Sequence, residues 1–187
     1  MKRWRLSDII IITLISILCG LIFWGADFVY NGIAALLTPV GLRPLANEIT
    51  IGIWIFAGTL SAGIFQRPGA ALLGDVISAV VETILGSQWG VMNLITGAVQ
   101  GIGSEAGLAL TGYRHYDGLG MVTAAVTGTV VTFGFDLFNL GYDKYSLPFI
   151  GLLIATRLVS LLVISGWLPL LITKLLNRSR GLNSIRK

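Results

Sequence analysis

The stretch GDVISAVVETILGSQWGVMN, residues 74–93, places two carboxylic acids among apolar side chains. Asp75 and Glu82 are seven residues apart, which is about two helical turns, so a helix directs both acids to one side. A charged side chain at the centre of a membrane helix costs at least about 2.5 kcal/mol on insertion scales, and such residues commonly serve ions, protons or ligands. These two acids are therefore the first candidates for a functional site.

Other polar residues repeat a helical spacing in the apolar stretches that follow. Asn93 and Gln100 are also seven apart, and Asp136 and Asn139 are three apart, so each pair shares one helix face. Counting depth from the ends of each apolar stretch predicts an outer group of acids, amides and aromatic rings. The candidate substrate-binding residues are Tyr30, Glu48, Trp54, Glu82, Trp89, Asn93, Gln100, Asp136 and Asn139.

This outer group is rich in carboxylates, amides and rings, and poor in bases. Carboxylates attract a cation, amides can satisfy ring nitrogens or a hydroxyl, and aromatic side chains stack on flat rings. The pattern predicts a pocket for a small, flat, polar or cationic molecule. Two alternatives stay open, namely that the tryptophans form an interfacial aromatic belt and that Glu82 makes a structural hydrogen bond to a neighbouring helix.

A deeper group contains Asp75, Glu105 and Arg157. Arg157 is the only base at that depth, and we expect it to neutralise Asp75 or Glu105 in a structural role. A different hypothesis is that Glu82 and Asp75 handle protons in a self-sufficient secondary carrier.

The composition places these side chains in a membrane. The chain has 187 residues, of which 55% are hydrophobic and only 12% are charged, and this combination indicates an integral membrane protein. Its net charge of +4 arises mainly at the chain ends and in short loops, so it does not indicate nucleic-acid binding. One cysteine, Cys19, and one histidine, His115, argue against a metal centre. Without nucleotide-binding or hydrolase motifs, we expect neither an enzyme nor a cofactor.

Six apolar stretches have the length needed to cross the hydrocarbon core, which takes about 20 residues. They are too long for strands and lack a two-residue alternation. They predict an all-α membrane protein, in which residues 1–187 form one domain, a bundle of six transmembrane helices. The predicted helices cover approximately residues 7–26, 46–65, 68–87, 89–112, 118–140 and 147–176.

The basic residues predict the orientation, because loops rich in lysine and arginine stay in the cytoplasm. If the N- and C-termini are cytoplasmic, ten of the 13 basic residues lie inside, Arg43 and Lys144 lie outside, and Arg157 lies within the last helix. The ten are Lys2, Arg3, Arg5, Arg67, Arg114, Lys174, Arg178, Arg180, Arg186 and Lys187.

The longest predicted connection, residues 27–45, is expected to be an extracellular loop. Long loops of this kind often act as lids over a site, although a segment lying on the bilayer surface is an open alternative. Small-residue pairs such as Gly97 with Gly101 and Gly103 with Gly107 predict close helix packing within the bundle. The alternative is that the first three helices use such pairs, including Ser16 with Gly20, to dock another membrane protein.

The stretches EITIGIWIFAGTLSAGIFQRPGAALLGDVISAVVETILGSQWGV (48–91) and GAVQGIGSEAGLALTGYRHYD (97–117) carry a resemblance to a known family. They resemble the YkoE-like branch of the S components, the substrate-binding membrane subunits of energy-coupling factor (ECF) transporters. That branch is associated with thiamin and its hydroxymethylpyrimidine precursor. The resemblance covers nearly the whole chain, although the first helix and the C-terminus match only in character.

The resemblance implies a multi-pass protein of the prokaryotic plasma membrane that binds a vitamin from outside. It implies docking on a transmembrane T subunit that carries two cytoplasmic ABC-type ATPases, which agrees with the lack of a nucleotide motif in this chain. Glu82 could accept from the pyrimidine amine, and Trp89 could stack on a ring. An S component for a different vitamin and a stand-alone secondary carrier remain as alternatives.

Overall fold

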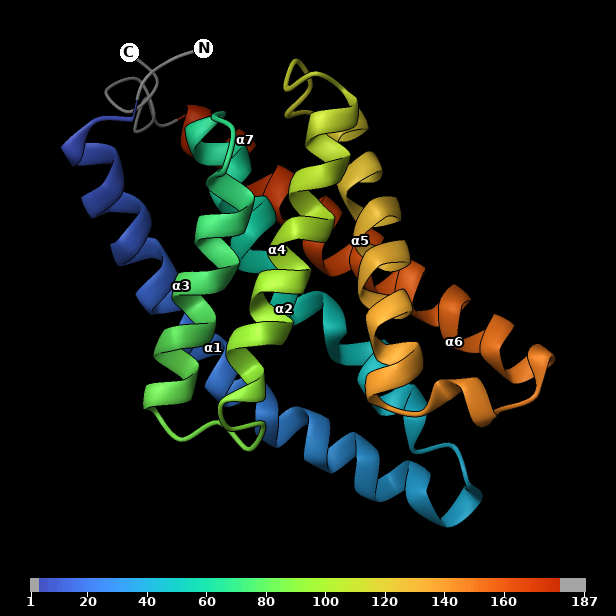
Figure 1. The fold of residues 1–187 in the computed structure, drawn as a ribbon. Helices are drawn as coiled ribbons and strands as arrows, with labels where there is room; N and C mark the ends of the chain where they lie inside the picture. The colour runs from blue at the N-terminus through green and yellow to red at the C-terminus, as the bar shows by residue number, and fades with distance from the viewer. Residues whose placement is uncertain (1–3, 179–187) are drawn as a thin grey trace.

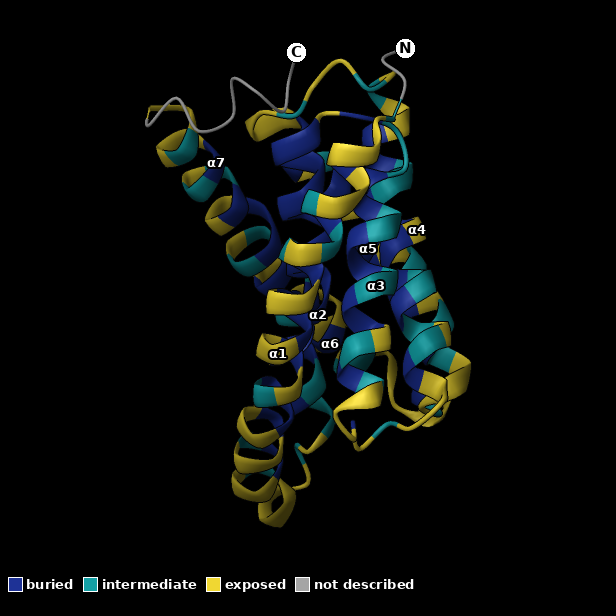
Figure 2. Cartoon of the chain, turned by 90° about the vertical axis from the view of Figure 1, so that its left-hand side faces the viewer, coloured by how far each residue is buried: buried dark blue, intermediate teal, exposed yellow. Residues whose placement is uncertain are grey.

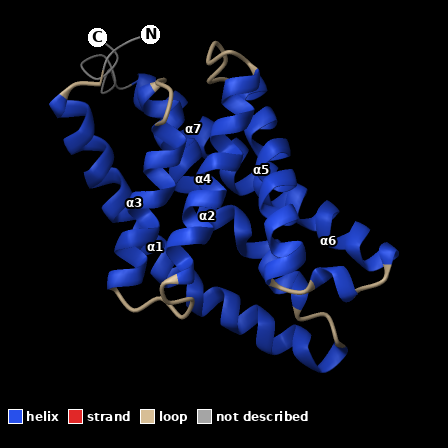
Figure 3. Cartoon of the chain, viewed as in Figure 1, coloured by secondary structure: helices blue, strands red, loops and turns tan. Residues whose placement is uncertain are grey.

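The apolar runs of the sequence are helices in the computed structural model, which describes residues 4–178. Within that range the chain contains helices and loops only (Figures 1 and 3). A π-helical segment, Leu161–Trp167, joins α6 to α7 without a break, so these three elements form one long final helix. The helices are α1 (Leu6–Leu37), α2 (Pro44–Phe65), α3 (Ala70–Ile84), α4 (Met92–Leu110), α5 (Gly118–Asn139), α6 (Leu147–Ser160) and α7 (Leu168–Arg178), with short 3-10 turns at Thr38–Val40 and Tyr142–Lys144.

Four of the helical segments in the described range are long and apolar enough to cross a membrane. They are Leu6–Val40, Pro44–Phe65, Gly118–Asn139 and Leu147–Arg178. The remaining two, α3 and α4, have 15 and 19 residues. At 1.5 Å per residue α3 is only about 22 Å long, which is less than the roughly 30 Å hydrocarbon core. The predicted all-α membrane protein is confirmed, and the crossing of the bilayer by α3 and α4 stays a prediction.

The segment 27–45 was expected to be a loop, and this expectation is wrong for most of its length. Helix α1 continues to Leu37, and only the short connection between Leu37 and Pro44 turns the chain, through the left-handed residue Gly41 (φ 75°). The predicted first helix ended at about residue 26, just before the charged residue Asp27. Its side chain is instead buried inside the fold, and the first strong helix breaker is Pro39. The other predicted stretches end within three residues of the observed helices.

The connections sort to two ends of the bundle, which we name by the predicted orientation. At the inner end α1 begins and α7 ends, together with the α2–α3 turn and the α4–α5 connection that carry Arg67 and Arg114 (Figure 1). At the outer end lie the α1–α2, α3–α4 and α5–α6 connections, the first and last of which carry Arg43 and Lys144. This arrangement agrees with the predicted sorting of basic residues, of which Lys2, Arg3, Arg180, Arg186 and Lys187 lie outside the described range.

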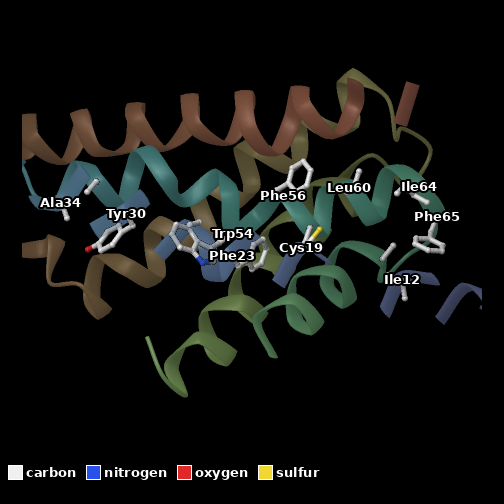
Figure 4. Packing of buried hydrophobic residues seen from close by; sticks show 14 residues of the cluster. Ile12, Cys19, Phe23, Tyr30, Ala34, Trp54, Phe56, Leu60, Ile64 and Phe65 are labelled. Carbon is white, nitrogen blue, oxygen red and sulfur yellow. The ribbon is translucent and has the colours of Figure 1, made fainter. Parts of the chain in front are cut away.

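Helix α2 occupies the centre of the bundle, and 89% of its most apolar window is buried. Residues of α1 pack along it, including Phe23 and Tyr30 beside Trp54 (Figure 4). By contrast, α1 shows a long exposed apolar face, visible in yellow in Figure 2. Such a face is stable in lipid, because the acyl chains are as apolar as the side chains they touch.

Glycines bring α4 close to both of its neighbours. A Cβ added to Gly97 or Gly101 would lie 2.5 to 2.8 Å from atoms of α3, and one added to Gly107 would lie 2.5 Å from the backbone of Ala124 in α5. These small-residue pairs therefore pack inside the bundle. The same holds for Gly20 of α1, where an added Cβ would lie 2.6 Å from Val81 of α3. Ser16 and Gly20 of α1 are thus not free to dock a partner.

The contact at Gly107 leads to a stability prediction. Substitution of Gly107 by alanine should lower the free energy of unfolding by about 1 to 3 kcal/mol, because the methyl group meets the backbone of α5 rather than a movable side chain. Gly134 on the same pair of helices is the matched control, since nothing lies within 4 Å of its Cβ position. Thermal unfolding in detergent measures both variants. Equal melting temperatures for Gly107→Ala and Gly134→Ala would contradict the close packing.

Candidate functional site

A half-open cleft with an empty volume of about 620 Å³ lies between α2, α4 and α5. Each helix contributes one face at helical spacing, so the cleft has three regular walls. Its walls consist of Asn47, Ile51 and Trp54 from α2, Met92, Asn93, Thr96, Val99 and Gln100 from α4, and Thr132, Phe135, Asp136 and Asn139 from α5. Trp89 and Leu140, from the connections at the outer end, complete the lining.

The lining combines aromatic rings with side-chain amides. Asn47, Asn93, Gln100 and Asn139 supply the amides, and Asp136 is the one acid among the lining residues. The lining residues include no base. Such a surface suits a flat molecule that has ring nitrogens, an amine and a positive charge, because amides pair with the first two and carboxylates attract the third.

Glu82 lies directly behind this lining and is fully buried. One carboxylate oxygen, Oε1, accepts from Trp54 Nε1 (3.1 Å) and Ser87 Oγ (3.1 Å), and the other, Oε2, accepts from Asn93 Nδ2 (2.8 Å). These contacts confirm that Glu82 bonds to neighbouring helices, but two of its donors are themselves cleft residues. Glu82 therefore reaches the cleft through Trp54 and Asn93, which it orients.

The Asn93 amide has a fixed direction because its nitrogen is surrounded by acceptors. Besides Glu82, Nδ2 has two other acceptors, the Ala79 carbonyl oxygen (3.1 Å) and Thr83 Oγ1 (3.2 Å). With Nδ2 held on this side, Oδ1 is the atom that Asn93 can offer to the cleft. Asn93 thus presents a hydrogen-bond acceptor, which is what the amine of a ligand requires.

Gln100 lines the cleft at the level below Asn93. Its side chain is only 8% exposed and has no hydrogen-bond partner among residues 4–178. The residue lines the open cleft, so a ligand there can bond to its amide, and each such bond would contribute about 0.5 to 1.5 kcal/mol. This amide offers a donor and an acceptor to the same molecule.

Arg157 joins two of the predicted site residues into a buried ionic network. Its Nε donates to Glu48 Oε2 (2.5 Å), and its Nη2 donates to Glu48 Oε1 (2.8 Å) and Asp136 Oδ2 (2.7 Å). Thr132 accepts from Nη1 at 3.0 Å, and the Phe133 ring lies beneath the guanidinium, 5.1 Å from its centroid. With two acids and one base, the network carries one formal negative charge beside the cleft.

Tyr142, in the connection that follows α5, completes this network from the outer end. Its hydroxyl donates to Glu48 Oε1 at 2.9 Å. Burial and then the Glu48 carboxylate raise the pKa of the Tyr142 hydroxyl above its ordinary value. The hydroxyl therefore stays protonated and acts as a donor at neutral pH.

Arg157 was predicted to pair with Asp75 or Glu105, and this prediction is wrong. Asp75 accepts from the Gly58 backbone N–H at 2.6 Å, and Glu105 accepts from the backbone N–H groups of Gly69 (2.6 Å) and Ala71 (3.0 Å) at the start of α3. The depth estimate failed because it assumed upright helices, whereas α6 is strongly tilted (Figure 1). The tilt keeps Arg157 near the outer ends of α2 and α5, and Glu105 serves as an α3 cap.

Tyr30 lies behind the Trp89 ring and outside the cleft lining. The two rings meet edge to face with centroids 5.1 Å apart. The Trp89 indole N–H donates to Asp27 Oδ1 at 3.0 Å. The half-buried Trp89 ring is therefore held by α1 on one side and forms part of the cleft on the other.

The structure brings the nine predicted binding residues into one region. Six of them line the cleft, namely Trp54, Trp89, Asn93, Gln100, Asp136 and Asn139. Glu48, Glu82 and Tyr30 contact lining residues from behind. The sequence reasoning missed Asn47, Thr96, Thr132 and Phe135, which a search at spacings of four and seven from Trp54, Gln100, Asp136 and Asn139 would have found.

The whole fold matches a solved structure described as "Crystal structure of an S-component of ECF transporter". The TM-score is 0.86 at 28% sequence identity, and the match covers 97% of this chain and 90% of the other. The match in fold thus gives the class of protein as an S component of an ECF transporter.

Sequence comparison narrows this class. The chain is 32% identical over 168 residues to "Putative HMP/thiamine permease protein YkoE" of Bacillus subtilis (strain 168), which covers 90% of this chain and 82% of that protein. A family model described as "ABC-type cobalt transport system, permease component" matches residues 7–131. The chain belongs to the YkoE-like family of ECF transporter S components. These relatives confirm the predicted class, a multi-pass membrane transporter subunit of the plasma membrane that is not an enzyme.

The word cobalt in the family description has no counterpart in the site. Residues 4–178 contain no group of three or more His, Cys, Asp or Glu side chains that could hold a metal ion. The lining of amides and aromatic rings suits an organic molecule better than a divalent cation.

Proposed function

We propose that this S component binds thiamin or its hydroxymethylpyrimidine precursor in the α2–α4–α5 cleft and receives it from the outer side of the membrane. The B. subtilis relative whose printed name includes HMP and thiamine supports this choice of ligand. The predicted orientation supports entry from outside, because the cleft lies close to the connections at the outer end.

The observation that carries the proposal is that two anchored tryptophans line the same cleft as two amides, of which Asn93 has a direction fixed by its hydrogen bonds. The indole N–H groups of Trp54 and Trp89 are each held by a carboxylate, so both rings have fixed positions at the cleft. Asn93 offers an acceptor for the pyrimidine amine, and Gln100 offers a donor and an acceptor for the ring. A ring stacked on one indole would gain about 1 kcal/mol beyond area burial.

The charges near the cleft favour a cation. Glu82 has neutral donors only among the described residues, and the Arg157 network retains one formal negative charge. A thiazolium bound in the cleft would compensate this negative potential. Hydroxymethylpyrimidine lacks the cation, so it would use the amides and rings alone.

We further propose that release of the ligand depends on a T subunit with two cytoplasmic ATPases. Ser16 and Gly20 of α1 are buried against α3, so docking requires a different surface from the small-residue face. The exposed apolar faces of α1 and of the α6–α7 helix are the proposed docking regions. Uptake by vesicles that contain this chain with and without an energising module tests the proposal, and uptake by the chain alone under a proton gradient would instead support a secondary carrier.

Gln100 provides the sharpest test of the cleft. Substitution by leucine should reduce thiamin affinity about tenfold to a hundredfold, because the amide loses its bonds to the ligand while the side-chain volume is kept. Isothermal titration calorimetry of the purified chain measures the affinity, and thermal unfolding reports on the fold. Ile102→Leu, on the exposed side of the same helix, is the control. Unchanged thiamin affinity in Gln100→Leu would remove this cleft as the site.

A further inference from the structure

Asp27 connects α1 to the turn that carries Trp89. Oδ1 of Asp27 accepts from Trp89 Nε1 and from Gln88 Nε2, both at 3.0 Å, and Oδ2 accepts from the Gln88 backbone N–H at 3.4 Å. Asp27 is only 6% exposed, so its carboxylate lies inside the fold although Gln88 is exposed. An ionised acceptor makes stronger hydrogen bonds than a neutral one.

The α3–α4 turn has few other means of fixing its position. Gly86 and Gly90 flank Trp89 with left-handed φ angles of 94° and 58°, and a Cβ at either position would meet nothing within 4 Å. Both glycines are exposed, and so are Gln88 and Val91 of the same turn. Beyond its own helix ends, the turn is held by Ser87 bound to Glu82 and by the bonds to Asp27.

We propose that Asp27 is a positioning residue for the binding site, which sets the Trp89 ring as a wall of the cleft and links that wall to the outer half of α1. The proposal rests on the proposed function for its effect on ligand affinity. Asp27 itself is not among the lining residues, so it acts through Trp89.

Tyr30, one turn further along α1, supports the same link. Its ring packs edge to face against Trp89 on the face of α1 that also carries Asp27. A displacement of this half of α1 would therefore move the acceptor and the packing partner of Trp89 together. Trp24, also on α1, is 38% exposed, and its ring contacts Phe28 of the same helix.

A double-mutant cycle tests whether Asp27 works through Trp89. Asp27→Asn should weaken thiamin binding about tenfold, because an amide oxygen accepts more weakly than an ionised carboxylate and the new amide nitrogen cannot accept from the Gln88 backbone N–H that Oδ2 binds. Trp89→Phe keeps a ring but removes the indole N–H. In the Trp89→Phe background, Asp27→Asn should therefore change affinity less than threefold. The same tenfold loss in both backgrounds would overturn the proposal.

Fluorine NMR of the chain labelled with 5-fluorotryptophan tests the link without any ligand. The chain has five tryptophans, and Trp89→Phe identifies the Trp89 resonance by its disappearance. Asp27→Asn should shift or broaden that resonance and leave the Trp24 resonance in place. An unmoved Trp89 resonance would overturn the proposal even if thiamin affinity fell.

Two further comparisons separate this proposal from the proposed function. The exposed acid Asp143 is the control, and Asp143→Asn should leave both the Trp89 resonance and the affinity unchanged. If the wild-type chain bound neither thiamin nor hydroxymethylpyrimidine, the proposed function would fail, while the ligand-free resonance would still decide the Asp27–Trp89 link. A thiamin-binding chain whose affinity is equal in Asp27→Asn and wild type would refute the positioning role alone.

Discussion

Glu82→Gln should lower the affinity for thiamin by about tenfold to a hundredfold while the protein stays folded. The carboxylate accepts from Trp54, Ser87 and Asn93, and a glutamine in the same place replaces one acceptor oxygen by a donor. At least one of these donors must then turn away, which displaces an indole or an amide of the cleft wall. The substitution also removes a negative charge beside the proposed thiazolium position.

Measurement with two ligands separates these effects. Calorimetric titration with hydroxymethylpyrimidine, which has no cation, should show a smaller loss than titration with thiamin. An equal loss for both would mean that Glu82 acts only by orienting Trp54 and Asn93. Unchanged affinity for thiamin, in a variant with a normal melting temperature, would remove Glu82 from the site.

The helices were predictable from the sequence because lipid imposes a simple length rule. Apolar stretches of about 20 residues must cross the core, and the basic residues sort their ends. The length rule did not predict that residues 27–37 are helical. This segment begins with the charged residue Asp27 and is only moderately apolar. The Asp27 carboxylate is buried because Gln88 and Trp89, some 60 positions later in the chain, donate hydrogen bonds to it. A contact between residues so far apart cannot be predicted from the local sequence pattern.

Most of the polar residues that line the cleft were also predictable from the sequence. Spacings of seven in α4 and of three in α5 placed Gln100, Asp136 and Asn139 on their correct faces. Periodicity gives the face of a helix but not the partner of a side chain. Glu82 was predicted to contact the ligand, and in the structure its carboxylate accepts from three protein donors behind the lining, which no periodicity could predict.

The Arg157 network shows that the depth of a side chain along its helix does not predict its partner either. Glu48 and Asp136 were predicted to contact the ligand, and in the structure both form ion pairs with Arg157. Helix tilt decided this pairing, and tilt follows from packing between helices rather than from the hydropathy of one helix. Asp136 nevertheless belongs to the lining, so the network and the cleft share one carboxylate.

Arg157→Met should destabilise the protein by about 3 to 5 kcal/mol, which is the largest effect expected of any single substitution here. Glu48 is fully buried and Asp136 is 7% exposed, so loss of the guanidinium leaves two carboxylates without a cation in a medium that solvates them poorly. The melting temperature in detergent and the yield of folded protein measure the effect. Arg43→Met and Lys144→Met, at exposed positions of the outer end, should be close to wild type.

Neutralising the acids should reverse this loss. The triple variant Arg157→Met, Glu48→Gln, Asp136→Asn contains no buried charge at this position, and replacement of a whole buried ionic cluster is often neutral for stability. We expect it to regain most of the melting temperature lost by Arg157→Met alone. Its affinity for thiamin should remain below that of wild type, because the negative charge of the network is gone. An Arg157→Met variant with normal stability and selectively reduced affinity would instead place the guanidinium in the binding site.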